Sequence, residues 1–247
     1  MCRYHTLSDD YYVNINLSTE MDLSHSRENV LHYFEQIQKH YPGLRNFYCR
    51  DRGEFVLEED KDQESYRWAS VETRRICSGH VNPSSVEDAL RQHERVLEIA
   101  PYALSASRLD CESLNLMFGF DFTYRGNHNQ LLVDALGVTP AFEPLLGLPG
   151  VTVVGHEPFL QLAMDGDCRT QCRIGFETRT NAYHVRTGEY PEEQLSVYLT
   201  ARRYGSLDAD ETFVSVLHRL AAICQRLIDE HLADNILRPL QMTIAIK

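Results

Sequence analysis

The fold is decided by the stretch LNLMFGFDFTY, residues 114–124. Apolar side chains occupy every second position from Leu114 to Tyr124, and most of the positions between them are polar or small. A period of two places alternate side chains on the same face of a strand. The stretch therefore predicts a long strand, and its aromatic face, which includes Phe118, Phe120 and Phe122, is expected to lie beneath helices.

Further strands and helices follow from the same kind of pattern on either side of this stretch. Alternation predicts strands over residues 11–17, 44–49, 54–57, 66–77, 159–164, 168–180, 195–201 and 240–246. Asp165-Gly166 predicts a hairpin turn between two of these strands. Apolar stripes of helical period predict helices that begin after Ser24 or Ser26, at Ser85, after Asn127 and at Asp208, and that end at Pro42, Pro101, Gly137 and Leu232.

Strands outnumber helices, and short turns join the recognisable hairpins. This order predicts an α+β fold in which a mostly antiparallel, twisted sheet carries helices on one face. Two α+β halves are expected, residues 1–137 and 159–247, joined by an apolar crossover rich in proline and glycine over residues 138–158. The sequence leaves open whether the halves are similar repeats and whether they form one continuous domain.

Charge and cysteine content limit the classes of function. The 247 residues carry a formal charge of −12, which disfavours nucleic acid and anionic membranes as partners. The seven cysteines are odd in number and form no Cys-x-x-Cys pair, so reduced thiols are expected. The first residues contain no apolar stretch typical of a signal peptide, and residues 144–155 are too short and interrupted to cross a bilayer. We therefore expect a cytoplasmic, acidic protein.

Readable catalytic and cofactor motifs are missing from the sequence. It contains no Gly-x-Ser-x-Gly, no glycine-rich phosphate loop and no Gly-x-Gly-x-x-Gly. No cofactor and no catalytic residue are therefore assigned, although residues that converge only in the fold would leave no such motif. The first hypothesis is a non-catalytic module that binds a ligand or a partner chain and associates with itself as a homodimer.

Four arginines carry this hypothesis. Arg169, Arg173 and Arg179 share one face of a predicted strand, and Arg202 lies on the polar side of a neighbouring strand. In an acidic chain, these residues would concentrate positive potential on one sheet surface. Guanidinium groups form bidentate contacts with carboxylates and phosphates, so an anionic small ligand or an acidic partner is the expected binder. The alternative is a solvated face whose arginines pair with neighbouring carboxylates.

Two other functions remain open on sequence grounds. Gly126-Asn127-His128 is typical of metal-dependent phosphoesterases, and together with Asp121 and His156 it would make a metal-assisted hydrolase. The other motifs that usually accompany it are absent from the chain. A hydrophobic-ligand carrier would instead need a cavity lined by Phe118, Phe120 and Phe122 beneath the C-terminal helix.

Overall fold

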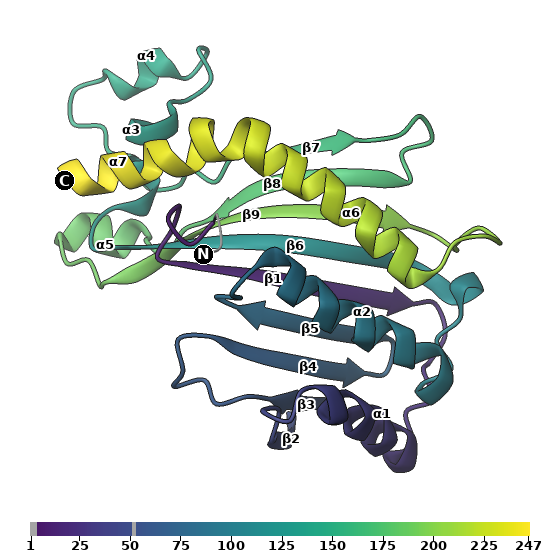
Figure 1. Cartoon of the computed structure of the whole chain (residues 1–247). Helices are drawn as coiled ribbons and strands as arrows, with labels where there is room; N and C mark the ends of the chain where they lie inside the picture. Colours follow the sequence, from purple (N-terminus) through teal and green to yellow (C-terminus); the bar gives the residue numbers. More distant parts are fainter. Residues whose placement is uncertain (1–3, 51–52) are drawn as a thin grey trace.

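A single antiparallel sheet organises the computed structural model, which describes residues 4–50 and 53–247. Within these residues the sheet has nine strands in the order β2-β3-β4-β5-β1-β6-β9-β8-β7 (Figure 1). Their bounds are β1 Asp10–Thr19, β2 Asn46–Arg50, β3 Glu54–Glu58, β4 Tyr66–Glu72, β5 Arg75–Val81, β6 Cys111–Tyr124, β7 Phe159–Ala163, β8 Thr170–Glu177 and β9 Glu193–Tyr204. The α+β class predicted from the sequence is confirmed.

The helices pack on one face of this sheet, as predicted. α1 (Arg27–His40) and α2 (Val86–Ala103) cover the part built from β1 to β5, and α6 (Phe213–Leu227) crosses β6 and β9 (Figure 1). The C-terminal helix continues through a π-helical segment, η2 (Ile228–Leu237), into α7 (Arg238–Ile246). The remaining helices are η1 (Arg108–Asp110), α3 (His128–Leu136), α4 (Glu143–Leu146) and α5 (Ala182–Thr187).

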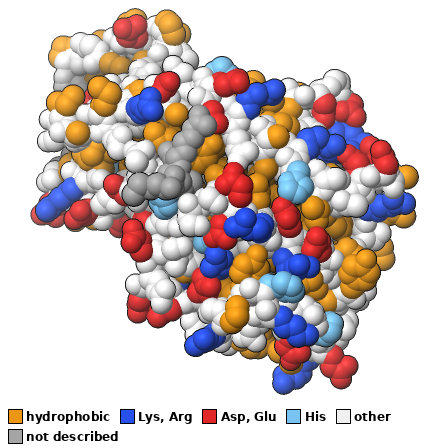
Figure 2. All heavy atoms as spheres, in the orientation of Figure 1, with side chains coloured by type: hydrophobic (Ala, Val, Ile, Leu, Met, Phe, Trp, Pro, Cys, Tyr) orange, Lys and Arg blue, Asp and Glu red, His pale blue; other side chains and the backbone are white. Residues whose placement is uncertain are grey.

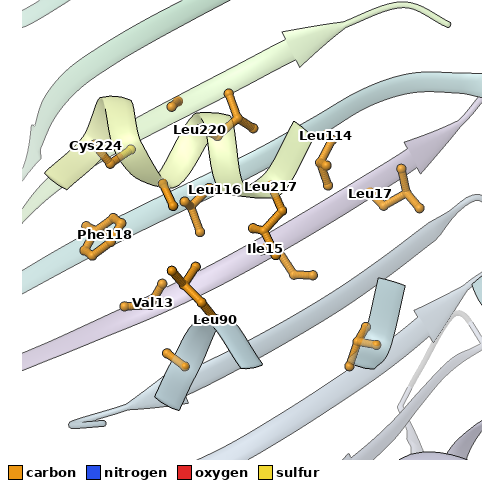
Figure 3. Packing of buried hydrophobic residues seen from close by; sticks show 14 of the residues in the cluster. Val13, Ile15, Leu17, Leu90, Leu114, Leu116, Phe118, Leu217, Leu220 and Cys224 are labelled. Carbon is orange, nitrogen blue, oxygen red and sulfur yellow. The ribbon is translucent and has the colours of Figure 1, made fainter. Parts of the chain in front are cut away.

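The core lies between the sheet and these helices. Leu114, Leu116 and Phe118 on β6 face Leu217 and Leu220 on α6, and all five are fully buried (Figure 3). Burial of a side chain of this size contributes about 1.5–3 kcal/mol. The aromatic face predicted for β6 is therefore the centre of the core.

Local capping accounts for most helix boundaries. The Ser26 and Ser85 hydroxyls accept hydrogen bonds from the first turns of α1 and α2, and the Asn127 side chain does so for α3. Gly137 ends α3 with φ +75°, a conformation that favours glycine. The predicted cap at Asp208 is wrong, because Thr212 caps α6 and its side chain accepts from the backbone N–H of Ser215.

Two other predictions about the elements are corrected. Residues 66–77 form parts of two strands rather than one, because the chain turns at Thr73-Arg74 and β5 pairs back on β4. Residues 240–246 are helical rather than extended, since the helix that starts at Phe213 continues through the π-helical segment η2 into α7, whose second residue is Pro239. Pro101 lies inside α2, which ends two residues later at Ala103.

The crossover between the halves lies largely on the surface. It contains α4, and its large apolar side chains are mostly exposed, from 37% at Leu146 to 59% at Phe142. Figure 2 shows hydrophobic side chains gathered at the upper left, where α4 lies in Figure 1. β6 pairs antiparallel with β1 over the whole length of β1, and its other side pairs with β9, which comes from the part of the chain after the crossover.

Candidate ligand-binding face

The sheet has a second face that points away from α1, α2 and α6, and we call it the open face. Leu116, Phe118 and Leu199 point toward the helices, so the residues that alternate with them, Met117, Tyr198 and Thr200, point to the open face. This face is mainly polar with scattered aromatic residues. It is the surface on which the sequence predicted the arginine cluster.

The strand register arranges the C-terminal half of the open face in transverse rows. Thr200 lies between Met117 and Arg173, and Arg173 also lies opposite Gln161 on the edge strand. The next row along the strands is Asn115, Arg202, Gln171 and Ala163. Arg173 and Arg202 are thus diagonal neighbours, a relationship that places two residues roughly 7–8 Å apart.

These rows form the floor of a hollow of about 380 Å³. The volume is that of a small-molecule site. The side chains that line it are mainly polar and aromatic, and they include Gln161, Gln171, Arg173, Glu177, Tyr198, Thr200, Arg202 and Tyr204.

Arg173 is exposed within the hollow and available to a ligand. Its guanidinium carbon lies 5.0 Å from the centre of the Phe159 ring, an attractive cation–π arrangement. Among the described residues, no carboxylate lies within ion-pair distance of Arg173, and none of its guanidinium N–H groups has a hydrogen-bond acceptor. The aromatic ring therefore orients the guanidinium group while its donors remain free.

Arg202 is held more firmly. Its Nε donates to Asn115 Oδ1, and one terminal nitrogen donates to the Tyr204 hydroxyl at 2.9 Å. The guanidinium carbon also lies 5.2 Å from the centre of the Tyr204 ring. In the described part of the chain Arg202, like Arg173, has no carboxylate partner. Neutral groups orient its charge, and the charge remains uncompensated.

Carboxylates lie toward one end of the hollow and are already engaged. Glu177 accepts a hydrogen bond of 2.7 Å from the Tyr198 hydroxyl and forms an ion pair of 2.7 Å with Arg179. Asp121, farther along β6, is almost fully buried and accepts from the Tyr12 hydroxyl at 3.3 Å. Burial raises the pKa of Asp121 above its ordinary value.

The structure brings together only two of the four arginines predicted for this face. Arg169 lies just before β8 and follows Cys168, which adopts φ +58°. The guanidinium group of Arg169 donates to the Ser206 carbonyl and lies 3.8 Å from the Asp208 carboxylate. Arg179 follows β8 and pairs with Glu177. The hollow therefore contains Arg173 and Arg202, while Arg169 and Arg179 serve local ion pairs.

The residues of the metal hypothesis have structural partners. His128 is fully buried, and its Nδ1 accepts from the Arg179 backbone N–H at 3.2 Å. Nε2 therefore carries the proton and donates to the Tyr124 carbonyl at 3.1 Å. Burial lowers the pKa of His128. Both ring nitrogens are engaged by backbone groups, so coordination of a metal would require one of these hydrogen bonds to break.

Asn127 and His156 are tied into the same loop region. The Asn127 side chain caps α3 and donates to the Val153 carbonyl at 2.7 Å. The backbone N–H of His156 donates to Asn129 Oδ1 at 2.7 Å. Within residues 4–50 and 53–247, no three histidine, cysteine, aspartate or glutamate side chains are grouped so that they could hold a metal ion.

The carrier hypothesis rests on the aromatic face of β6. Phe118, Phe120 and Phe122 are at most 2% exposed and belong to the continuous core. Tyr4 packs edge-on against both Phe118 and Phe120, with ring centres 6.3 Å apart in each case. Neighbouring side chains pack against these rings, so the rings form part of the core and do not line a hollow.

Sequence reasoning missed the aromatic residues that orient the two arginines. Phe159 lies on a predicted strand and Tyr204 lies three residues beyond another, but their contacts depend on the register of β7, β8 and β9. The Asp165-Gly166 turn could have placed Phe159 near Arg173, since β8 folds back on β7 after it. No comparable signal links Arg202 to Asn115, because these residues are 87 positions apart.

No helix in the described chain combines the length and apolar character needed to span a membrane. No protein-family model matches the sequence, and no curated protein matches it either.

Proposed function

We propose that the protein is a non-catalytic, cytoplasmic module that binds a small organic anion in the hollow on the open face. One observation carries the proposal: Arg173 and Arg202 share this hollow and have no carboxylate partner among the described residues. The chain contains 36 acidic residues, and it pairs many of its other arginines with them. Two uncompensated arginines on a polar floor favour a ligand that carries the missing negative charge.

The chemistry of the floor narrows the class of ligand. Two arginines that are diagonal neighbours on the floor suit a ligand with two anionic groups or one branched anion. Gln161, Gln171 and Thr200 offer neutral hydrogen-bonding groups between and beside them. Tyr198 and Tyr204 add aromatic surface for the body of the ligand. A di- or tricarboxylate, or an organic phosphate, meets these requirements.

The direct test is binding of simple anions to the full chain. Citrate and inorganic phosphate serve as probes in titration calorimetry, with Arg173→Gln, Arg202→Gln and the double variant beside the wild type. Each exchange removes charge-assisted hydrogen bonds and should weaken binding roughly tenfold or more. Added salt should weaken wild-type binding.

The matched control is Arg186→Gln. Arg186 also lies over an aromatic ring, with its guanidinium carbon 5.6 Å from the centre of the Tyr183 ring, but it is not part of the hollow. This variant should bind citrate like the wild type. If neither probe binds the wild type, or if the double variant binds as tightly as the wild type, the proposal is wrong.

A further inference from the structure

β7 is an edge strand without the usual protection. It lies at the end of the sheet, and all five of its residues, Phe159 to Ala163, are exposed. None of them is charged, and none is proline. Natural edge strands commonly carry charges or proline that prevent pairing with another chain. The opposite edge strand, β2, follows this rule with Arg50, which forms an ion pair with Glu54.

The backbone of β7 has one row of groups free to pair. The Met164 N–H donates to the Thr170 carbonyl at 2.8 Å. Every second residue counted back from Met164, namely Leu162 and Leu160, therefore hydrogen-bonds to β8 through its backbone. By this alternation the N–H and C=O groups of Phe159, Gln161 and Ala163 point away from β8. Gln161 is the middle one of the three.

Apolar surface continues from β7 into the crossover segment. In residues 142–162, nine large apolar side chains are between 37% and 65% exposed: Phe142, Leu145, Leu146, Leu148, Val151, Val154, Phe159, Leu160 and Leu162. The segment contains only two carboxylates, Glu143 and Glu157, and no lysine or arginine. An exposed apolar surface of this extent marks an interaction site.

We propose that β7 pairs with β7 of a second copy of this chain, antiparallel and about a two-fold axis at Gln161. In this register Gln161 lies opposite Gln161 of the second copy, and Phe159 lies opposite Ala163. The three outward-facing residues of each strand then form about six backbone hydrogen bonds. The result is one continuous sheet through both copies, and the exposed edge of each disappears.

The side chains are complementary in this register. Leu160 of one copy lies opposite Leu162 of the other on the helix side of the sheet. The two-fold axis repeats this contact, so two such leucine pairs become buried. Large Phe159 faces small Ala163 on the open face. An isologous contact of this kind needs a surface that is complementary to itself about the axis, and the outer edge of β7 meets this requirement.

The low charge and the exposed apolar side chains of β7 and the crossover segment both favour a second copy of the chain as the partner that binds this edge. Each copy carries −12, so two copies repel at most surfaces but meet here with only two carboxylates each. A stable interface buries about 800 Å² per partner, so the contact must include exposed apolar side chains of the crossover segment as well as β7. A basic partner would gain little here, because the segment has few charges to attract it.

The test is the molecular mass of the full chain in solution, by light scattering over a range of concentrations. The expected mass is twice the 28.5 kDa of the chain. Leu160→Lys and Gln161→Pro should each give the mass of a single chain, with unchanged circular dichroism and a melting temperature that no longer depends on protein concentration. Leu160 is 54% exposed, and the ladder alternation points the Gln161 N–H away from β8, so neither change should disturb the fold.

Leu109→Lys is the matched control, because Leu109 is 74% exposed and lies away from β7 in η1. It should leave the mass of the wild type unchanged. A positive check is Gln161→Cys, since opposed residues of a hydrogen-bonded pair have Cα atoms about 5.5 Å apart, within disulfide range. Mild oxidation should link this variant into a covalent dimer, whereas the parent chain with its exposed Cys49 and Cys168 should not be linked.

The proposal fails on any of three results. The first is a wild type of single-chain mass at every concentration. The second is a dimer that persists in both Leu160→Lys and Gln161→Pro, which would place the contact elsewhere. The third is a Gln161→Cys variant that forms no more covalent dimer than the parent.

Discussion

Nε2 of His93, on α2, donates to the Val13 carbonyl in the middle of β1 at a distance of 3.1 Å. The other ring nitrogen accepts from the Ser78 hydroxyl at 3.1 Å, and that hydroxyl accepts from the Gln92 side chain at 2.8 Å. His93 is fully buried, so only its neutral form fits this network. The network joins α2 to two strands of the sheet.

Stability should fall in acid because of this network. Burial lowers the pKa of His93 to about 3, and burial followed by the charge of Arg67 lowers that of His80 to about 4. The unfolded chain takes up these protons near pH 6.5, so the stabilisation is complete above pH 6.5 and is lost as pH falls toward 4 and 3. At pH 5 the expected loss is on the order of 2 kcal/mol per histidine.

Urea unfolding between pH 5 and pH 8 measures this loss. His93→Gln should be less stable than the wild type at pH 8 but should show a shallower decline in acid. His40→Gln, the same exchange on an exposed side chain, is the control. An equally steep decline in His93→Gln would show that the acid sensitivity comes from other groups.

A methyl group at Gly79 should disturb the open face. A Cβ atom there would overlap Nε1 of Trp68 and Oδ1 of Asn14. Gly79→Ala should therefore displace the indole ring and cost about 1–3 kcal/mol. Trp68 is the single tryptophan of the chain, so its fluorescence spectrum reports the displacement directly. In Gly166→Ala, where a Cβ would meet nothing within 4 Å, the spectrum should be unchanged.

Core packing against β6 should dominate stability. Leu116 is fully buried beneath α6, and Leu116→Ala should lower the free energy of unfolding by about 2–5 kcal/mol. Leu145→Ala makes the same change at a side chain that is 55% exposed and should leave the free energy of unfolding of the single chain within about 0.5 kcal/mol of the wild type. Chemical denaturation measures the free energy of unfolding of both variants. Similar losses in Leu116→Ala and Leu145→Ala would contradict this account of the core.

His128→Ala separates a structural role from a metal role. Loss of the imidazole leaves the Arg179 N–H and the Tyr124 carbonyl without partners, which should cost about 2–4 kcal/mol. Metal analysis of wild type and variant, purified without chelator, should give the same result for both. Stoichiometric metal in the wild type that disappears in the variant would instead support the metal-assisted hydrolase.

The sequence predicted the fold best where a long pattern left one interpretation. Six apolar side chains at every second position from Leu114 to Tyr124 do not fit the period of a helix, and β6 lies where this pattern predicts a strand. Leu240, Met242, Ile244 and Ile246 show the same spacing, yet they are helical because the preceding helix continues into them. A short alternation cannot decide between strand and helix when the neighbouring element determines the outcome.

The candidate site was predictable in part. Arg173 lies on the predicted face because β8 is regular from Thr170 to Glu177. Arg169 does not, since the positive φ of Cys168 interrupts the alternation just before it. The contact between Arg202 and Asn115 depends on the pairing of β6 with β9, which are separated by most of the second half of the chain. Local patterns carry no information about such a pairing.

The pairing of β1 with β6 has a consequence for synthesis of the chain. Val13 lies opposite Phe118, and ribosomes add about 5–20 residues per second, so β1 waits roughly 5–20 s for its second neighbour. During that interval, β5 can already pair with one side of β1, while the other side stays unpaired on the nascent chain. The pairing of β1 with β6 is thus completed only after residue 124 has been added, and until then the free side of β1 is accessible to a chaperone.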